Sequence, residues 1–267
     1  MPESHQRPFA LITGASSGIG EAFADRYAAM GYDLGVVARN PDRLQALASR
    51  LEAAHGVTAK AISADLAEAG VETKILSALG GRRVDALVNN AGFGIPRVYL
   101  AAPWSLQRDF LMSMAVAPCA LAYAVLPAMV QAGAGSIINV ASVAGFSPGV
   151  AGNTLYPAVK SLIIKFSQAL DLEVRARGVR VTALCPGPTR TAFMTRAGVA
   201  DAGARPSIFS QTPEAVVQAA LRGNAAGRAV VIPGVANRVS VFLLRRLPES
   251  LVRAAVNAGA ARYLLED

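Results

Sequence analysis

The chain has few of the residues that build metal centres and disulfide frameworks. It holds 2 cysteines and 2 histidines among 267 residues, and Cys119 and Cys185 are too far apart for a CxxC spacing. Both lie in apolar surroundings, so we expect two buried thiols in a reducing compartment, with no disulfide and no metal site. Charged residues are also scarce, at 16%, while hydrophobic residues make up 53%. That composition excludes a disordered chain.

The positive charge lacks the pattern of a nucleic-acid-binding protein. The net charge is +8, but 22 of the 26 basic residues are arginines that are spread along the sequence. No basic run is interleaved with aromatic residues, so we expect no nucleic-acid partner. A pocket for a phosphorylated ligand accounts for the positive charge better than nucleic-acid binding does.

Targeting and membrane signals are sparse as well. The first nine residues, MPESHQRPF, are polar and have no apolar signal-peptide core. The stretch from Met112 to Val130 has nineteen uncharged residues, which is long enough to span a bilayer. It contains Pro118 and Pro127 and lies inside an alternating α/β pattern, so a buried or interface helix is the favoured interpretation. We expect a cytoplasmic protein.

Short apolar, β-branched runs alternate with longer helical patterns. The predicted strands are Phe9–Thr13, Leu34–Ala38, Ala59–Ser63, Ala86–Asn89, Ser136–Ala141, Arg180–Leu184 and Ala229–Ile232. The predicted helices are Gly18–Met30, Pro41–His55, Leu66–Leu79, Trp104–Gln131 and Leu155–Arg177. This alternation indicates an α/β fold with one Rossmann-like domain over residues 1–267. Its core is a doubly wound parallel sheet of about seven strands with helices on both faces.

Two segments depart from the alternation. Residues 189–212 hold glycines, prolines and isolated apolar side chains, and a long irregular connection of this kind is typical of a substrate loop. Residues 235–267 form a C-terminal extension with two arginine-bearing amphipathic patterns, Val235–Leu247 and Pro248–Leu265. A cap over the substrate end, an oligomer contact and a membrane-surface contact are three open interpretations of the extension.

A glycine-rich turn follows the first strand and opens the first helix. It reads TGASSGIG from Thr13 to Gly20, with Gly14, Gly18 and Gly20 at GxxxGxG spacing. Glycines let the backbone approach a pyrophosphate, and the free N–H groups of the helix start face the anion. The position of this turn directly after the first strand therefore favours a dinucleotide site.

The end of the second strand indicates which dinucleotide. An acidic residue there binds the ribose 2′-hydroxyl of NAD, whereas an arginine accommodates a 2′-phosphate. This chain has Arg39, so we expect NADP(H) rather than NAD(H), with Ser16 and Ser17 as further hydrogen-bond donors to the phosphate. Asp65, near the end of the third strand, is expected to accept from the adenine amino group, with helix N-capping as the alternative.

A tyrosine and a lysine stand four residues apart at Tyr156 and Lys160, and Ser142 lies fourteen residues before the tyrosine. Residues four apart on a helix share one face. A nearby cation favours the ionised phenol and is expected to lower the tyrosine's pKa from its usual value of about 10. Such a tyrosine can pass a proton to or from a substrate oxygen.

These motifs together resemble the short-chain dehydrogenase/reductase superfamily over roughly residues 8–192. They are the TGxxxGIG turn, Asn89-Asn90-Ala91-Gly92 after strand four, Ser142 with Tyr156-x-x-x-Lys160, and Pro186-Gly187 after strand six.

The resemblance implies a role for each residue. It makes Ser142, Tyr156 and Lys160 the catalytic residues, with Ser142 orienting the substrate oxygen, Tyr156 passing the proton and Lys160 holding the nicotinamide ribose. Its cofactor residues are Gly14, Ser16, Ser17, Gly18, Ile19, Gly20, Arg39, Asp65, Asn90, Ala91, Gly92, Tyr156, Lys160, Pro186, Gly187, Thr189 and Thr191.

One position departs from the superfamily. An asparagine usually holds a relay water in the long helix, and that position falls on Met114 here. A thioether is only a weak acceptor and cannot donate. Either Ser113 or a water held by backbone carbonyls takes over, or turnover is reduced.

The sequence therefore predicts an NADP(H)-dependent oxidoreductase that interconverts a carbonyl and a secondary alcohol on an apolar small molecule. Two alternatives stay open: a regulatory NADPH-binding protein with weakened catalysis, and a membrane-surface reductase of 3-oxoacyl or steroid-like ketones. Residues expected to shape the pocket include Phe93, Ile95, Asn153, Phe193 and Met194. A homodimer or homotetramer through the two long helices is implied by the resemblance.

Overall fold

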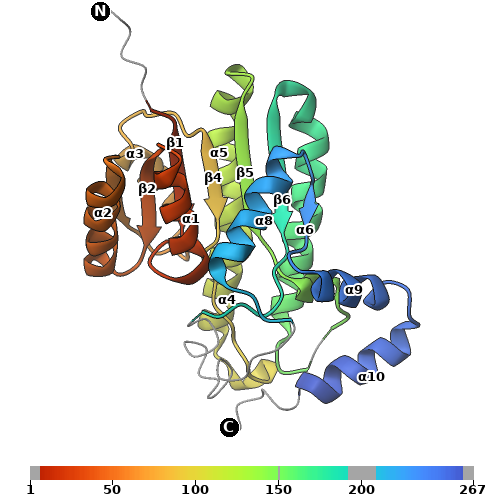
Figure 1. The fold of residues 1–267 in the computed structure, drawn as a ribbon. Coiled ribbons are helices and arrows are strands. Elements are labelled where there is room, and N and C mark those ends of the chain that lie inside the picture. The colour runs from red at the N-terminus through yellow and green to blue at the C-terminus, as the bar shows by residue number, and fades with distance from the viewer. Residues whose placement is uncertain (1–6, 150, 192–208, 261–267) are drawn as a thin grey trace, which may run out of the picture.

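The computed structural model describes residues 7–149, 151–191 and 209–260 as one α/β domain (Figure 1). Seven parallel strands form a single sheet in the order β3-β2-β1-β4-β5-β6-β7. They are β1 (Phe9–Thr13), β2 (Asp33–Ala38), β3 (Ala59–Ser63), β4 (Ala86–Asn89), β5 (Gly135–Val140), β6 (Val179–Leu184) and β7 (Val230–Val231). The predicted doubly wound parallel sheet is confirmed, with each strand within two residues of its predicted bounds.

A central strand such as β1 is apolar over most of its length because helices cover both faces of the sheet. In β1 all five residues are buried. Ala10 and Ile12 belong to the core on one face, and Phe9 and Leu11 belong to the core on the other. Successive side chains of a strand point to opposite faces, so a strand buried on both sides needs a continuous apolar run.

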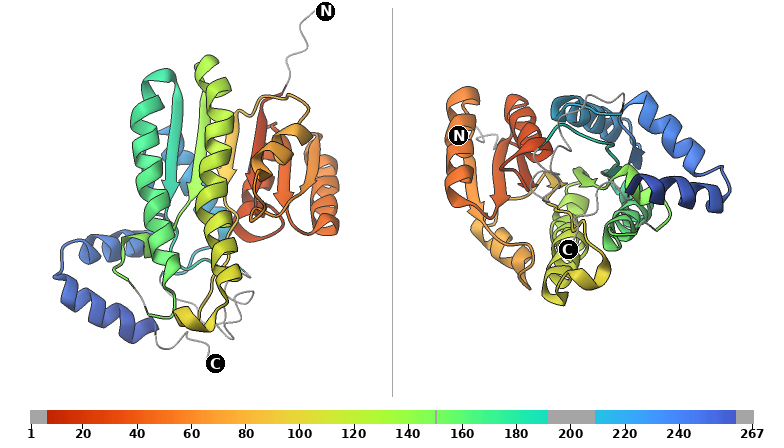
Figure 2. Two further views of the ribbon diagram at one scale, coloured as in Figure 1. Left: turned by 180° about the vertical axis from the view of Figure 1, so that it is seen from behind. Right: turned by 90° about the horizontal axis from the view of Figure 1, so that it is seen from below.

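Helices cover both faces of the sheet (Figures 1 and 2). One face packs against α1 (Gly18–Ala29), α2 (Pro41–His55) and α8 (Pro213–Ala225). The other packs against α3 (Val71–Ala78), α5 (Ala117–Gln131) and α6 (Leu155–Val174), which continues into the 3₁₀ turn η4 (Arg175–Arg177).

Helix α8 was not predicted from the sequence. The Thr212 hydroxyl accepts a hydrogen bond from the Ala215 N–H at 3.2 Å, and Pro213 occupies the first helical position. Both are standard signals of a helix start. The helix was missed because these signals lie at the end of the irregular segment 189–212.

The predicted helix from Trp104 to Gln131 contains a defect. It consists of α4 (Trp104–Leu111), a π-helical turn η2 (Met112–Val116) and α5. Within the described residues it is the one helix long and apolar enough to cross a membrane, but half of its apolar window is buried inside the protein. Its packing against the sheet favours a core helix. Cys119 on this helix is half-buried, less enclosed than predicted.

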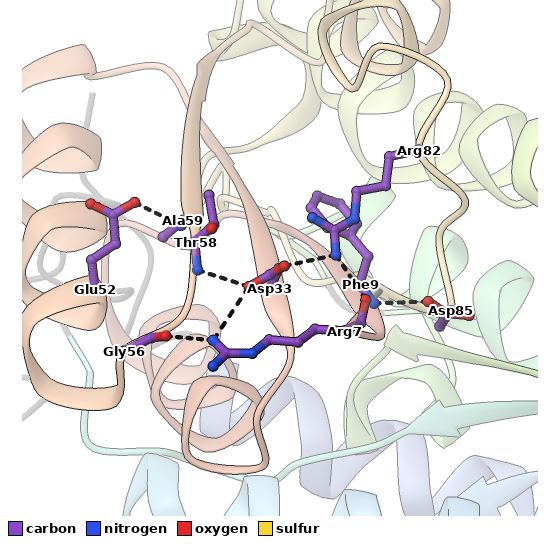
Figure 3. Close-up of polar contacts among 9 residues, drawn as sticks. All are labelled: Arg7, Phe9, Asp33, Glu52, Gly56, Thr58, Ala59, Arg82 and Asp85. Atoms are coloured by element: carbon purple, nitrogen blue, oxygen red, sulfur yellow. Dashed lines mark hydrogen bonds and ion pairs between the residues drawn. The ribbon is translucent and has the colours of Figure 1, made fainter. Parts of the chain in front are cut away.

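The amino edge of the sheet is held by charged side chains (Figure 3). The buried Asp33 carboxylate accepts hydrogen bonds from the Thr58 N–H at 2.8 Å and from Arg82 Nη2 at 2.7 Å. The Arg82 guanidinium also lies 4.8 Å from the centroid of the Phe9 ring. Asp85 accepts from the Phe9 N–H at 2.8 Å. The network joins the starts of β1, β2, β3 and β4 at the edge opposite the glycine turn.

Further helices and 3₁₀ turns, outside the strand–helix alternation, lie at the carboxyl edge of the sheet. These are η1 (Tyr99–Ala101), η3 (Val143–Phe146), α9 (Val235–Leu244) and α10 (Glu249–Ala260). Helices α9 and α10 project from this end of the molecule (Figure 2). They correspond to the two amphipathic patterns predicted in the C-terminal extension.

Candidate active site

The predicted site residues follow successive strands at one edge of the sheet. The strand order places Asp65, Arg39, the glycine turn, Asn90, Ser142 and Pro186 in that sequence along the edge. Neighbouring strands lie about 4.8 Å apart, so this row extends over about 24 Å from β3 to β6. Residues at the two ends of the row therefore cannot touch one small group. An elongated ligand is needed to contact them all.

The glycine turn is packed too closely for side chains. Gly14 and Gly18 have φ values of +66° and +61°. A Cβ on Gly14 would lie 2.7 Å from the Ala91 Cα, and one on Gly20 would lie 2.2 Å from the Gly14 carbonyl oxygen. Only glycine therefore fits at Gly14 and Gly20, and the turn leads directly into the start of α1. Ser16, Ser17 and Ile19 are half-buried in the same turn.

Arg39 and Asp65 mark the β2 and β3 end of the row. Arg39 is exposed, and its guanidinium has no ion-pair or hydrogen-bond partner in the part of the chain that the structure describes. Asp65 accepts a hydrogen bond from the Ala67 N–H at 3.0 Å. The N-capping alternative for Asp65 was wrong, because the N-cap of α3 is Gly70.

The asparagine pair after β4 connects the glycine turn to the interior. Asn90 Nδ2 donates to the carbonyl oxygens of Thr13 and Gly14, each at 3.1 Å. Asn89 Nδ2 is buried and donates to Asn139 Oδ1 at 2.9 Å and to the Pro118 carbonyl at 3.1 Å. Asn90 thereby fixes the position of the turn, and Asn89 links β4 to β5 and α5. Ala91 and Gly92 continue the same edge.

Ser142 and Tyr156 meet at the end of β5. Ser142 Oγ accepts from the Ala144 N–H at 3.1 Å, which leaves its O–H proton available as a donor. A side-chain hydrogen bond joins the Ser142 and Tyr156 hydroxyls and lowers the pKa of Tyr156. Burial has the larger effect, so the net pKa of Tyr156 lies above its usual value.

Lys160 lies beneath the tyrosine and is 5% exposed. Its Nζ donates to the Val140 carbonyl at 2.8 Å and stands 5.6 Å from the centroid of the Tyr156 ring. Burial lowers the pKa of Lys160 to about 8, and the nearby Cys185 opposes that shift. The pKa of Tyr156 is raised, so the prediction that Lys160 brings it below its usual value was wrong. The ammonium faces the ring and a carbonyl, and the surrounding protein destabilises both charged forms.

The segment after β6 closes the row. Pro186 is buried, and the Thr189 hydroxyl donates to the Gly187 carbonyl at 3.0 Å. A Cβ on Gly18 would lie 2.9 Å from Thr191 Cγ2, so Thr191 reaches back to the glycine turn. The structure therefore brings the first and last cofactor motifs of the sequence together.

Met114 lies in the π-helical turn and is 2% exposed. A Cβ on Gly92 would stand 3.2 Å from its Cε, which places the thioether beside the candidate site. In this turn the Ala117 N–H donates to the Met112 carbonyl, five residues back. In the same register the Ser113 carbonyl needs the N–H of residue 118, which is proline. The turn therefore leaves a backbone acceptor without its helical donor.

A small cavity lies beside Tyr156, with a volume of about 20 Å³. Its walls include the predicted residues Ile95 and Asn153 together with Arg97, Val98, Tyr99, Gln107, Phe110 and Leu155. Sequence reasoning missed Arg97 and Gln107 because no motif marks them. The one available signal was an amide on the apolar side of α4. The predicted pocket residues Phe193 and Met194 lie outside the described residues.

Comparisons with known proteins identify the family of the chain. A family model described as short chain dehydrogenase matches residues 8–202. Very-long-chain 3-oxoacyl-CoA reductase-B of Danio rerio is 31% identical over 217 residues, which cover 80% of this chain and 67% of that protein. A short-chain dehydrogenase from Sphingobium yanoikuyae, solved in complex with NADPH, is 35% identical with a TM-score of 0.79, covering 91% of this chain and 97% of that one. A bulky-bulky ketone specific alcohol dehydrogenase from Comamonas testosteroni is 32% identical with a TM-score of 0.75, covering 92% and 96%.

Proposed function

Because the chain belongs to the short-chain dehydrogenase family and is an oxidoreductase with a nicotinamide-cofactor fold, we propose that it interconverts a carbonyl and a secondary alcohol on an apolar small molecule. The observation that carries the proposal is the contact between the Ser142 and Tyr156 hydroxyls above the buried Lys160. Two hydroxyls that converge on one point can both bind a substrate oxygen.

The proton is handled by the chain's own residues. In reduction, Ser142 donates a hydrogen bond to the carbonyl oxygen, which has no proton to give, while its Oγ accepts from the Ala144 N–H. Tyr156 then transfers its phenolic proton to the same oxygen, and Lys160 is assigned to the nicotinamide ribose. The raised pKa of Tyr156 keeps the phenol protonated before substrate arrives. A bound nicotinamide cofactor supplies or accepts the hydride.

The cofactor fits the glycine turn and the row of groups beside it. The pyrophosphate is assigned to the turn because it leads into the start of α1, where free backbone N–H groups attract an anion. We propose NADP(H) over NAD(H), because the exposed Arg39 has no partner among the described residues and suits a 2′-phosphate. Asp65 Oδ1 accepts from the Ala67 N–H, and we assign the other carboxylate oxygen to the adenine amino group. Pro186, Gly187, Thr189 and Thr191 hold the nicotinamide end.

The relay to solvent runs past the π-helical turn in this proposal. The apolar Met114 cannot hold a water, but the carbonyl of the neighbouring Ser113 lacks its helical donor. A water on that carbonyl replaces the asparagine expected by resemblance. The alternative is a regulatory NADPH-binding protein with weakened catalysis. In that case Met114 marks the loss of the proton relay.

The substrate is proposed to be a bulky apolar ketone or its alcohol. The cavity walls beside Tyr156 are mainly apolar, with Val98, Tyr99, Phe110 and Leu155 among them. Two similar proteins carry names that specify bulky-bulky ketones and very-long-chain 3-oxoacyl-CoA. Homodimers or homotetramers are proposed to form through the outer sides of α5 and α6, where Tyr123 and Leu172 are 82% and 79% exposed.

The test is NADPH oxidation with a panel of bulky ketones, measured for the native chain and for Tyr156→Phe. We expect turnover that falls by roughly a hundredfold or more in Tyr156→Phe, because general acid catalysis contributes at least that much. Tyr123→Phe removes a hydroxyl from an exposed ring and is the matched control. Tight NADPH binding with no turnover on any ketone favours the regulatory alternative.

A further inference from the structure

Helix α9 turns its large apolar side chains outward. Val235, Val239, Phe242 and Leu243 are 66%, 52%, 57% and 47% exposed. Their spacing places them in one stripe along the helix, which we call the α9 face. The opposite side carries Asn237 and Val241, each 3% exposed, and attaches the helix to the domain. Beyond the helix, Leu247 and Leu251 are also exposed.

Arginines flank the α9 face. Arg238, Arg245 and Arg246 are exposed, and none of them has an ion-pair partner in residues 7–149, 151–191 and 209–260. The Arg246 guanidinium lies 5.1 Å from the centroid of the Phe242 ring. Between residues 235 and 254 the sequence has one acid, Glu249. The face thus combines apolar side chains with uncompensated positive charge.

We propose that the α9 face docks on the surface of a negatively charged lipid bilayer. Apolar side chains beside arginines match the acyl and headgroup layers of such a surface, and the overall charge of +8 adds attraction. A second copy is a poorer occupant. A two-fold interface must be self-complementary, and pairing this face with itself brings like-charged arginines together. Charge complementarity therefore selects an anionic lipid surface.

The docked surface lies at the catalytic end of the molecule. A Cβ on Gly187 would stand 2.3 Å from Asn237 Oδ1, so the inner side of α9 touches the turn after β6. Helix α9 also packs against η3, which begins immediately after Ser142. Both α9 and α10 project from the carboxyl edge of the sheet, where the candidate site lies (Figures 1 and 2). A bilayer on this face lies next to the route of an apolar substrate.

The experiment is co-sedimentation of the full chain with phosphatidylcholine vesicles that contain or lack phosphatidylglycerol. We expect binding to the anionic vesicles that weakens at high salt. Phe242→Glu combined with Val239→Glu should lower the partition coefficient by roughly tenfold or more, because it removes apolar contact and adds repulsion. Met30→Glu, which changes an exposed methionine at the end of α1, away from the carboxyl edge of the sheet, is the control and should bind as the native chain does.

Folding and catalysis are separated from docking in the same assay. The thermal midpoint of each variant establishes that it is folded, and Tyr156→Phe should bind vesicles normally whether or not it is active. The proposal is overturned by three results: no binding to anionic vesicles, equal binding by the double variant, or a native dimer that the double variant dissociates without any vesicle binding. The last result assigns the α9 face to a second copy.

Discussion

Gly187 lies against Asn237 with no room for a side chain between them. A Cβ on Gly187 would stand 2.3 Å from Asn237 Oδ1. Asn237 is 3% exposed, and its Nδ2 donates to the Pro233 carbonyl at 3.0 Å and to the Phe209 carbonyl at 3.3 Å. The turn after β6 is therefore fixed by a residue fifty positions later, on α9. Neither motif reasoning nor the resemblance identified Asn237.

Gly187→Ala is expected to disturb both stability and cofactor binding. The new methyl group must displace Asn237 or the turn, and overpacking of this kind costs about 1–3 kcal/mol. Chemical denaturation should show that loss, and the KM for NADPH should rise. Gly149→Ala is the control, because a Cβ there meets no atom within 4 Å. Equal behaviour of the two variants would contradict the role given to Asn237.

Arg39→Ala should change the choice of cofactor. Loss of a charged hydrogen bond to a 2′-phosphate costs about 1.5–3 kcal/mol, so the KM for NADPH is expected to rise by roughly tenfold or more. The KM for NADH, which lacks that phosphate, should stay nearly constant. Steady-state kinetics with both cofactors measure the ratio. Arg177→Ala, an exposed arginine in η4, should leave both values unchanged.

Lys160 should give the folding stability a specific pH dependence. Burial lowers its pKa from 10.5 to about 8 in the folded chain. Between pH 8 and 10.5 the unfolded chain binds more protons at this residue than the folded chain, so the free energy of unfolding gains a contribution that rises with pH. Lys160→Met should lack that contribution. Denaturation of both proteins across this range gives the difference, and parallel pH profiles would show that the pKa of Lys160 is not lowered in the folded chain.

Asp33→Asn should destabilise the fold without affecting the site. The substitution breaks the pair with Arg82, whose side chains are 10% and 20% exposed, and breaking a buried pair costs about 3–5 kcal/mol. The KM for NADPH should not change, because the network lies at the opposite edge of the sheet (Figure 3). Glu68→Gln removes an exposed pair with Lys74 and should cost less than about 1 kcal/mol. A loss as small as that control in Asp33→Asn would argue against the network.

Pro118→Ala tests the backbone relay. The new N–H can bond to the Ser113 carbonyl and occupy the acceptor proposed to hold the relay water. We expect kcat to fall while the KM for NADPH stays constant. Pro127→Ala changes the other proline of the same helix and is expected to leave kcat unchanged. If Pro118→Ala turns over like the native chain, the relay does not use this carbonyl.

Local patterns in the sequence were enough for the sheet and for most of the row of site residues. A strand such as β1, buried on both faces, needs a continuous apolar run, and that run is visible in the sequence. Parallel strands end at one edge, so motifs that follow β1, β4, β5 and β6 had to lie side by side. Helix α8 and the π-helical turn at Met112 were not predicted. The first followed an irregular segment, and the second depends on which carbonyls a proline leaves without donors.

The sequence by itself determined the seven strands and most of the helices between them, the glycine turn and the spacing of Tyr156 and Lys160. These follow from contacts between residues a few positions apart. Only the tertiary structure decided the direction of the tyrosine's pKa shift, the contact between Gly187 and Asn237, and the exposure of the α9 face. Desolvation and packing depend on which distant segments cover a group. No local pattern records that information.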